Sequence, residues 1–189
     1  MSKNVVDGKL VALSPSMLLS FDPTTGFGCE RRGYFKYVLG LKEAPSKGQQ
    51  LGTDLHALIA ERLTSGKRPE GNSQAAGLYL AGESMIELVA KRTIVGVEKP
   101  LSPFSLDGVS VKGFNDVITC DGIIDWKTSS SRKYLKTGEQ LKTDTQLIIY
   151  ASAEHPTLET VKVAHGQFVT VGNVEPKLVE VEISKKEID

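Results

Sequence analysis

The sequence predicts a mixed α/β fold in which a mainly helical first half is followed by a sheet. Apolar residues recur at helical spacing over residues 49–63, and β-branched residues become frequent after Thr93. In the second half, Asp121-Gly122 separates two apolar runs, which is a strong hairpin signal because type I′ turns favour this pair. Helices followed by strands, a helix and further strands are typical of an α+β or mixed α/β domain.

One domain is expected for the whole chain, residues 1–189. The chain has 189 residues, 40% of them hydrophobic, which is enough to bury a core. We expect residues 1–92 to form a mainly helical wall. Residues 93–189 should form the sheet core that contains the hairpin.

The helices of the first part are predicted from capping residues and apolar spacing. Ser14-Pro15 offers an N-cap residue followed by proline at the first helical position. A turn-rich break at residues 23–28 precedes a helix that should end at Gly40. The other helical ranges of this part are 29–39, 49–63 and about 73–92.

Strands dominate the second part of the sequence. Residues 94–97 and 109–111 are rich in valine and isoleucine, and the hairpin should cover residues 117–126. One more helix is then expected before the last two strands. These three elements are predicted at residues 141–153, 161–171 and 178–183.

Charge and composition exclude several classes of protein. The chain has 23 basic and 23 acidic residues, so no basic excess indicates a protein that coats nucleic acid. Residues 127–142 contain five basic residues and one acidic residue, which fits either a solvated surface or part of a binding site. No apolar run reaches the ~20 residues that span a bilayer, and no signal peptide is recognisable, so a cytoplasmic protein is expected.

The hairpin should place three polar residues on one face of the sheet. If Asp121 and Gly122 form the loop, Asp116 faces Lys127 and lies diagonal to Asp125. Side chains alternate along strands, so these three project from one side with Cβ atoms ~5–7 Å apart. Two such carboxylates can share a divalent metal ion. The opposite face should carry the packing residues Val117, Thr119, Ile124 and Trp126.

A plainer interpretation of the hairpin is a cross-strand ion pair between Asp116 and Lys127, which would contribute little to stability. That interpretation leaves Asp125 unexplained. A carboxylate beside Ile124 and Trp126 in a central strand is costly unless it binds a metal or a partner. The spacing alone leaves both interpretations open.

Five short motifs follow one another in a fixed order. Residues 113–116 (GFND) and 125–128 (DWKT) precede a helical QLIIY at 146–150, and GTDLH occupies 52–56 upstream. The segment 13–41 contains LSPS, CERR and YVLGL. This ordered set resembles the GxxD, DxKT, QxxxY and GxxxH motifs and the N-terminal opening of RecB-like nucleases of the PD-(D/E)XK superfamily. Within that family, these motifs are most similar in style to those of the CRISPR-associated and phage RecB-like exonucleases.

The resemblance implies a restriction-endonuclease-like core, a central mixed sheet flanked by helices, and a metal-dependent site. Asp116 and Asp125 would bind Mg²⁺ or Mn²⁺, for which oxygen ligands are suited. Lys127 would orient or help deprotonate the attacking water and offset charge in the transition state. The resemblance also implies that His56 and the backbone carbonyl of Trp126 are metal ligands. Glu98 would bind a second metal ion or a water molecule.

Other residues gain a role only through the resemblance. Gln146 and Tyr150 share a helix face one turn apart and would contact the scissile phosphate or brace Lys127. Without the motifs, Gln146 and Tyr150 would be an ordinary polar stripe on a helix. Glu98 would be an exposed strand residue, and His56 an ordinary surface or core residue. Candidate phosphate contacts are Arg31, Arg32, Ser129 and Arg132.

The sequence therefore predicts a metal-dependent DNA nuclease, an exonuclease acting at single- or double-stranded ends in recombination, repair or phage DNA processing. The alternatives are a structure-specific or restriction-like endonuclease and an inactive DNA-binding module that kept the fold. Many relatives hold an iron–sulfur cluster on four cysteines. This chain has only Cys29 and Cys120, so no such cluster is expected. A homo-oligomer and a recombination or replication partner protein are left open.

Overall fold

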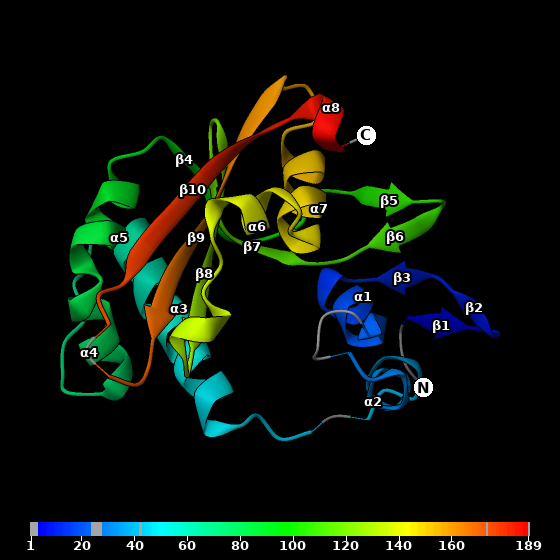
Figure 1. Ribbon diagram of the computed structural model, residues 1–189, viewed down its shortest axis with the longest axis horizontal. Helices are drawn as coiled ribbons and strands as arrows, with labels where there is room; N and C mark the ends of the chain where they lie inside the picture. The colour runs from blue at the N-terminus through cyan, green and yellow to red at the C-terminus, as the bar shows by residue number, and fades with distance from the viewer. Residues whose placement is uncertain (1–3, 24–27, 42, 173, 189) are drawn as a thin grey trace. The chain divides into compact units, whose positions relative to one another are not determined.

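The computed structural model of the chain describes residues 4–23, 28–41, 43–172 and 174–188 (Figure 1). It divides into two compact units. The N-terminal unit comprises Met1–Ala44 and Pro100–Phe114, and the sheet unit comprises Pro45–Lys99 and Asn115–Asp189. The division does not follow the expected boundary at residue 92, and the expectation of one domain stays a prediction. None of the helices in the described ranges combines the length and apolar character needed to cross a membrane.

The N-terminal unit combines short strands with helices. Its first helix begins at the predicted cap, where the Ser14 hydroxyl accepts a hydrogen bond from the Met17 amide at 3.2 Å. The predicted helix at 29–39 is an α-helical turn that continues as a π-helix and ends before Gly40, which has a φ of 72°. Part of the predicted break, residues 24–27, lies outside the described residues. The elements are β1 (Val5–Val6), β2 (Lys9–Leu10), β3 (Ala12–Leu13), α1 (Pro15–Phe21), α2 (Glu30–Gly33), the π-helix (Tyr34–Val38), β5 (Phe104–Leu106) and β6 (Val109–Val111).

Two small sheets hold the strands of this unit. β1 pairs antiparallel with β2, while β6 lies between β3, which is parallel to it, and β5, which is antiparallel. Only β6 was predicted from the sequence. Strands of two or three residues are too short to show the alternation on which a strand prediction depends.

The sheet unit contains the predicted mixed sheet, whose five strands lie in the order β10-β9-β8-β7-β4 (Figure 1). β8 runs parallel to β9, whereas β7 pairs antiparallel with β8 and β10 pairs antiparallel with β9. Its central strands are therefore the hairpin and the strand beside it. The strands are β4 (Ile94–Pro100), β7 (Phe114–Thr119), β8 (Gly122–Ser129), β9 (Thr160–Val169) and β10 (Lys177–Ser184).

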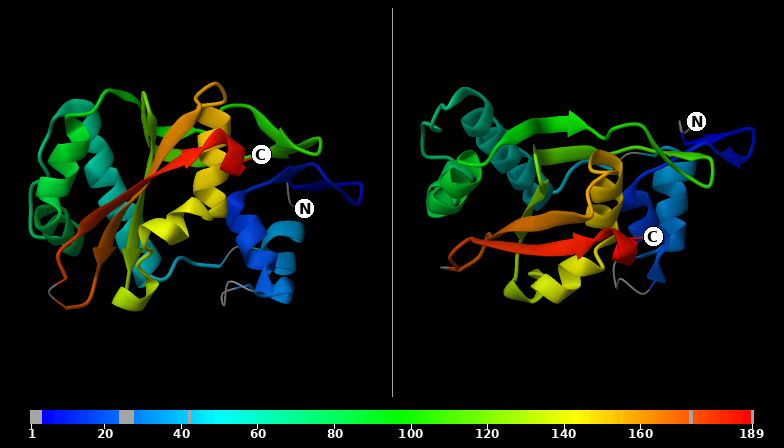
Figure 2. Two further views of the ribbon diagram at one scale, coloured as in Figure 1. Left: turned by 45° about the horizontal axis from the view of Figure 1, so that its top comes forward. Right: turned by 90° about the horizontal axis from the view of Figure 1, so that it is seen from above.

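Helices flank this sheet, as the two further views show (Figure 2). The predicted helices at 73–92 and 141–153 are each interrupted, because Gly82 separates two helices in the first case and Asp144 caps a new helix in the second. The helices are α3 (Lys47–Ser65), α4 (Gln74–Ala81), α5 (Glu83–Ala90), α6 (Gly138–Lys142), α7 (Thr145–Glu154) and α8 (Lys185–Ile188), with a 3₁₀ turn at Arg132–Tyr134.

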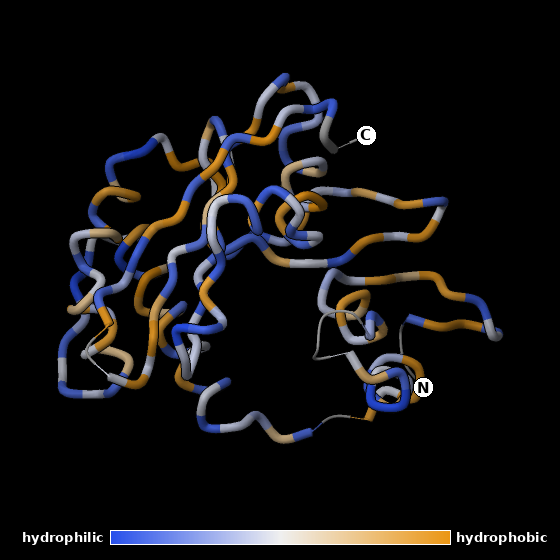
Figure 3. The backbone as a smooth tube through the Cα atoms, viewed as in Figure 1, coloured by the Kyte–Doolittle hydropathy of each residue, from blue (hydrophilic) through white to orange (hydrophobic). Residues whose placement is uncertain are grey.

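The main core lies between α3, α4, α5 and one face of the sheet. The predicted packing residues Val117, Ile124 and Trp126 are buried in it together with Leu55 and Ile59 of α3. Polar positions remain on the outside: hydrophobic and hydrophilic residues alternate along the edge strand β10, as expected for a strand with one covered face (Figure 3).

A glycine lets Trp126 lie flat against the neighbouring strand. A Cβ atom on Gly166 would lie only 2.1 Å from Cε3 of the Trp126 ring. Gly166 is the register partner of Trp126 in the parallel β8–β9 pair, so the ring covers the bare backbone of β9. This contact fixes the inner face of β8 and thereby directs Asp125 and Lys127 to the opposite face.

Candidate active site

The hairpin has the predicted faces but a different register. Thr119 pairs with Gly122 and Val117 with Ile124, so the loop is Cys120-Asp121 and the predicted pairing is wrong by two residues. Neither loop residue has the positive φ that a type I′ turn requires. Because the slip is an even number, each side chain keeps its face.

Gly122 is required for close packing rather than for the turn. A Cβ atom at this position would lie 2.1 Å from the carbonyl oxygen of Lys162 on β9. The Asp121-Gly122 signal therefore marked the hairpin correctly but for the wrong reason. In the actual register, Asp116 and Asp125 are the next residues outward from the Val117–Ile124 pair.

Three potential metal ligands converge at Asp116. One ligand atom each of His56, Glu98 and Asp116 lies within 4.8 Å of the others. Nδ1 of His56 is 3.4 Å from Oδ2 of Asp116, and the same oxygen accepts a hydrogen bond from the Trp126 amide at 2.7 Å. This hydrogen bond from the Trp126 amide fixes the carboxylate of Asp116, which is the member of the cluster that lies on the hairpin.

Gly52 lets helix α3 bring His56 to the hairpin. A Cβ atom on Gly52 would lie 2.8 Å from Oγ1 of Thr128 on β8. His56 follows one turn later on the same face. The glycine of the GxxxH segment thus allows helix α3 to approach strand β8 closely.

Glu98 reaches the cluster from strand β4 in a strained backbone conformation. Its φ of 46° lies in the left-handed region, which is uncommon for a residue other than glycine. Strain of this kind, of order 1–3 kcal/mol, is retained mostly at functional sites. The sequence indicated Glu98 only through the motif order, and the structure brings it to His56 and Asp116.

Asp125 belongs to a second group of side chains beside this trio. Its Oδ2 forms an ion pair with Nζ of Lys127 at 2.5 Å, and its Oδ1 accepts a hydrogen bond from Nε2 of Gln146 at 2.7 Å. Nζ of Lys127 also donates to Oε1 of Gln146 at 3.1 Å. Gln146 therefore fixes the carboxylate and the ammonium relative to each other.

The crowding of charges changes the protonation of the site. Burial, with a contribution from Asp116, raises the pKa of Asp125 to about 6 against the opposing effect of Lys127. Burial and the Asp116 carboxylate also raise the pKa of Glu98. Burial opposes the charged forms of His56 and Lys127, but the carboxylates of Asp116 and Asp125, respectively, outweigh it and raise both pKa values.

A layer of polar residues behind Asp125 was not predicted from the sequence. His165 is the register partner of Asp125 on β9 and is 2% exposed. Its Nε2 lies 3.8 Å from Oδ2 of Asp125 and 3.8 Å from Oδ2 of Asp144. Burial and the charge of Lys127 lower the pKa of His165 to about 4, so the ring is neutral at pH 7.

Asp144 connects this layer to helix α7. Its Oδ1 caps the helix by accepting from the amides of Gln146 and Leu147, at 2.9 and 3.2 Å, and its Oδ2 pairs with Nζ of Lys136 at 2.5 Å. Gln167 of β9 holds the Lys136 backbone through two hydrogen bonds of 2.7 Å. A histidine and a glutamine at alternate positions in the apolar second half of β9 were the available sequence signal.

The remaining predicted site residues lie in different surroundings. Tyr150 is buried one turn after Gln146. The Ser129 hydroxyl is occupied in a local turn, donating to the Ser131 carbonyl at 2.9 Å, and Arg132 is exposed in the adjacent 3₁₀ turn. Arg31 and Arg32 are exposed and belong to the N-terminal unit.

The donor set at Asp116 suits a divalent cation. Opposite ligands in an octahedral Mg²⁺ shell are about 4.2 Å apart, because each lies at about 2.1 Å from the ion. The spread of up to 4.8 Å between ligand atoms needs only a small contraction. Two carboxylates with one imidazole suit Mn²⁺ as well as Mg²⁺. The residues present therefore fit such an ion.

Comparison with known proteins identifies the fold. No protein-family model matches the sequence, and no curated protein matches it. A candidate exonuclease from Eubacterium rectale has a similar structure, with a TM-score of 0.63 and 15% identity over 94% of this chain and 74% of the other. The exonuclease LHK-Exo from Laribacter hongkongensis, solved with dAMP, gives a TM-score of 0.50 and 11% identity over 93% and 80% of the two chains. The chain therefore shares the fold of these two structures, and the mixed sheet flanked by helices agrees with the fold that its motifs predicted.

Proposed function

We propose that this chain is a metal-dependent DNA nuclease that acts as an exonuclease at DNA ends. The observation that carries the proposal is the convergence of His56, Glu98 and Asp116 beside the Asp125–Lys127 pair. Such an arrangement offers cation ligands and a partly exposed ammonium close to one another. The names of the structural neighbours, one a candidate exonuclease and the other an exonuclease solved with the nucleotide dAMP, support the choice of reaction and substrate.

Each residue of the site has a specific part in this proposal. Asp116, Asp125, His56, Glu98 and the backbone carbonyl of Trp126 would hold one or two Mg²⁺ or Mn²⁺ ions. The bound ion supplies Lewis acidity and a more acidic water.

Catalytic side chains complete the site. Lys127 would orient the attacking water and offset negative charge on the phosphate in the transition state. Gln146 would keep Lys127 in place, and Tyr150 would support the same helix. Ser129, the last residue of β8, and Arg132 of the following 3₁₀ turn would contact DNA phosphates.

The test is cleavage of end-labelled linear DNA, single- and double-stranded, in Mg²⁺, Mn²⁺ or a chelator. Asp116→Asn and Asp125→Asn are the informative variants, since an amide still accepts the hydrogen bonds from the Trp126 amide and from Gln146. Each should lower the cleavage rate by on the order of 100-fold or more, because it removes an anionic ligand. The matched control is Asp107→Asn, an exposed turn residue with a φ of 48° that asparagine tolerates.

Closed circular DNA determines whether the enzyme requires an end. An exonuclease leaves a covalently closed plasmid intact and degrades the same plasmid after linearisation. Nicking or linearisation of the circle would identify an endonuclease instead. Binding without any metal-dependent cleavage, equal in wild type and both variants, would identify a DNA-binding module and overturn the proposal.

A further inference from the structure

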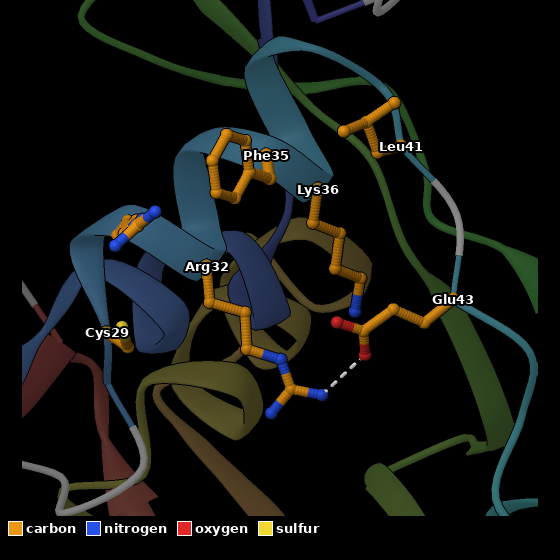
Figure 4. A pocket seen from close by; sticks show the side chains of 7 residues that line it. Cys29, Arg32, Phe35, Lys36, Leu41 and Glu43 are labelled. Carbon is orange, nitrogen blue, oxygen red and sulfur yellow. Dashed lines mark hydrogen bonds and ion pairs between the residues drawn. The ribbon is translucent and has the colours of Figure 1, made fainter.

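The N-terminal unit contains a pocket that the proposed catalytic residues do not use. It has a volume of about 380 Å³, within the range of about 300–1,000 Å³ common for small-molecule sites. Figure 4 shows the side chains that surround it. The lining residues come from α2, the π-helix and the segment that follows: Cys29, Arg31, Arg32, Phe35, Lys36, Leu41 and Glu43.

An irregular backbone presents the apolar part of this pocket. The π-helix Tyr34–Val38 carries Phe35, and π-helical turns occur frequently at functional sites. After the left-handed Gly40, the amide of Leu41 donates to the Phe35 carbonyl at 2.9 Å. This hydrogen bond folds the chain back, so both Phe35 and Leu41 line the pocket. Their side chains are 39% and 57% exposed and are therefore accessible to a ligand.

One cation lies over the exposed ring of Phe35, and two more line the same pocket. The Arg31 guanidinium lies 5.7 Å from the centroid of Phe35, and Lys36 is the next residue. Among the described residues, neither cation has a carboxylate partner. Arg32 pairs with Glu43 at 2.8 Å, but both side chains are more than 60% exposed, so this ion pair is weak and can open. The lining thus carries three cations and one anion.

We propose that this pocket binds an unpaired base of single-stranded DNA. The base would stack on Phe35 beside Leu41, and the adjacent phosphates would contact Arg31 and Lys36. Aromatic side chains in a basic groove are the common means of binding single strands, because every base has a π-face. The choice of DNA rests on the proposed function, but the site is separate from the metal ligands.

Binding of a fluorescent oligothymidylate to the full chain, in chelator, tests the stacking. Phe35→Ala should raise the Kd about fivefold or more, since base–aromatic stacking contributes about 1–3 kcal/mol per base. Phe35→Tyr should restore wild-type affinity because it keeps the ring. Leu39→Ala is the matched control: Leu39 is 43% exposed beside the π-helix but does not line the pocket. Equal affinity of Phe35→Ala, Leu39→Ala and wild type would overturn the proposal.

Salt dependence separates stacking from phosphate contacts. Each phosphate contact to a single strand contributes about −0.7 to the slope of log K against log salt concentration. Lys36→Gln should therefore lower the steepness of that slope by about 0.7, while Phe35→Ala leaves it unchanged. Glu43→Gln should tighten binding, because it removes the anion that holds Arg32. Weaker binding of Glu43→Gln would contradict the assignment.

Cys29 gives a direct readout of occupancy, since its exposed thiol lines the pocket. With Cys120→Ser, Cys29 is the sole thiol of the chain. Oligothymidylate should slow maleimide labelling of Cys29, and an abasic strand should protect less. Equal protection by an abasic strand or by anionic lipid vesicles would show that the pocket recognises polyanions rather than bases. Cleavage with Mg²⁺ is measured separately, so protection without cleavage would refute the nuclease proposal alone.

Discussion

Gln146 of helix α7 donates a hydrogen bond to Oδ1 of Asp125 at 2.7 Å. The same side chain accepts one from Lys127 through Oε1, so a single amide bridges the buried carboxylate and the ammonium. An amide is suited to this position because it offers both a donor and an acceptor. A carboxylate could accept from Lys127 but could not donate to Asp125, and an aliphatic side chain could do neither.

Replacement of this amide should impair turnover more than metal binding. We expect Gln146→Ala to lower kcat by about 10–100-fold, as is typical for residues that orient a metal ligand. Gln146→Glu should be at least as damaging, since a second carboxylate cannot donate to Asp125 at neutral pH. Steady-state kinetics on linear DNA is the measurement, with Gln50→Ala on exposed α3 as the control. Unchanged kcat in both Gln146 variants would mean that the bridge has no catalytic part.

His56 should contribute to metal affinity in a pH-dependent way. If it is a ligand, His56→Ala should require more Mn²⁺ for half-maximal cleavage, and high Mn²⁺ should recover part of the activity by mass action. Asp116 raises the pKa of His56, and a protonated imidazole cannot bind a metal, so Mn²⁺ affinity of the wild type should fall as the pH drops through this raised value.

The Mn²⁺ dependence of cleavage at several pH values checks the role of His56. The matched control is His155→Gln. His155 is also half-buried, but its ring nitrogen lies 3.1 Å from the Gly122 carbonyl and not beside Asp116. Superimposable Mn²⁺ curves for wild type and His56→Ala would place His56 outside the metal shell.

Asp144 should stabilise the fold above its own pKa. Burial opposes its ionisation, but the hydrogen bond from Lys136 outweighs this effect and lowers the pKa of Asp144. A depressed pKa means that the stabilisation is complete above the unfolded value of about 3.9 and is lost as the pH falls through the folded value.

Asp144→Ala should therefore reduce the free energy of unfolding by about 1–3 kcal/mol at pH 7, since it removes a helix cap and an ionic hydrogen bond. Asp144→Asn should lose less, because asparagine still caps α7. Urea unfolding between pH 3 and 7 is the measurement. A difference between wild type and Asp144→Asn that does not shrink toward pH 3 would show that the charge of Asp144 has no part in stability.

The sequence predicted the site better where the signal was local. The main helices and the strands of the five-stranded sheet followed from apolar spacing and β-branched composition, and the shared face of Asp116, Asp125 and Lys127 followed from alternation along two strands. The register was predicted wrongly, because Asp121-Gly122 favours a type I′ turn while the need for a glycine arises from the Lys162 carbonyl of β9. That constraint is tertiary and lies 40 residues away in the sequence.

Residues behind the site were not predicted for the same reason. His165 lies beside Asp125 only because β8 and β9 pair in parallel, which a crossover through α6 and α7 makes possible. Asp144 was read as the interior of one helix, although its side chain begins a new one. Short polar residues that cap helices are visible in a sequence, but which of them lies near Asp125 depends on the packing of the helix.

The contact between Gly166 of β9 and the ring of Trp126 fixes the face of the hairpin. Gly166→Ala should destabilise the protein by about 1–3 kcal/mol or more, because its Cβ would lie 2.1 Å from the Trp126 ring and the indole is fully packed. The matched control is Gly77→Ala in helix α4, where a Cβ meets nothing within 4 Å. That change should stabilise by about 0.5–1 kcal/mol, since alanine favours helices over glycine. Thermal unfolding of the three proteins measures the two opposite shifts. If Gly166→Ala also moves Asp125, cleavage activity should fall in folded protein below the melting transition, whereas Gly77→Ala keeps wild-type activity. Equal melting temperatures for Gly166→Ala and wild type would mean that the Trp126 ring has room to move, and that another contact fixes the face of β8.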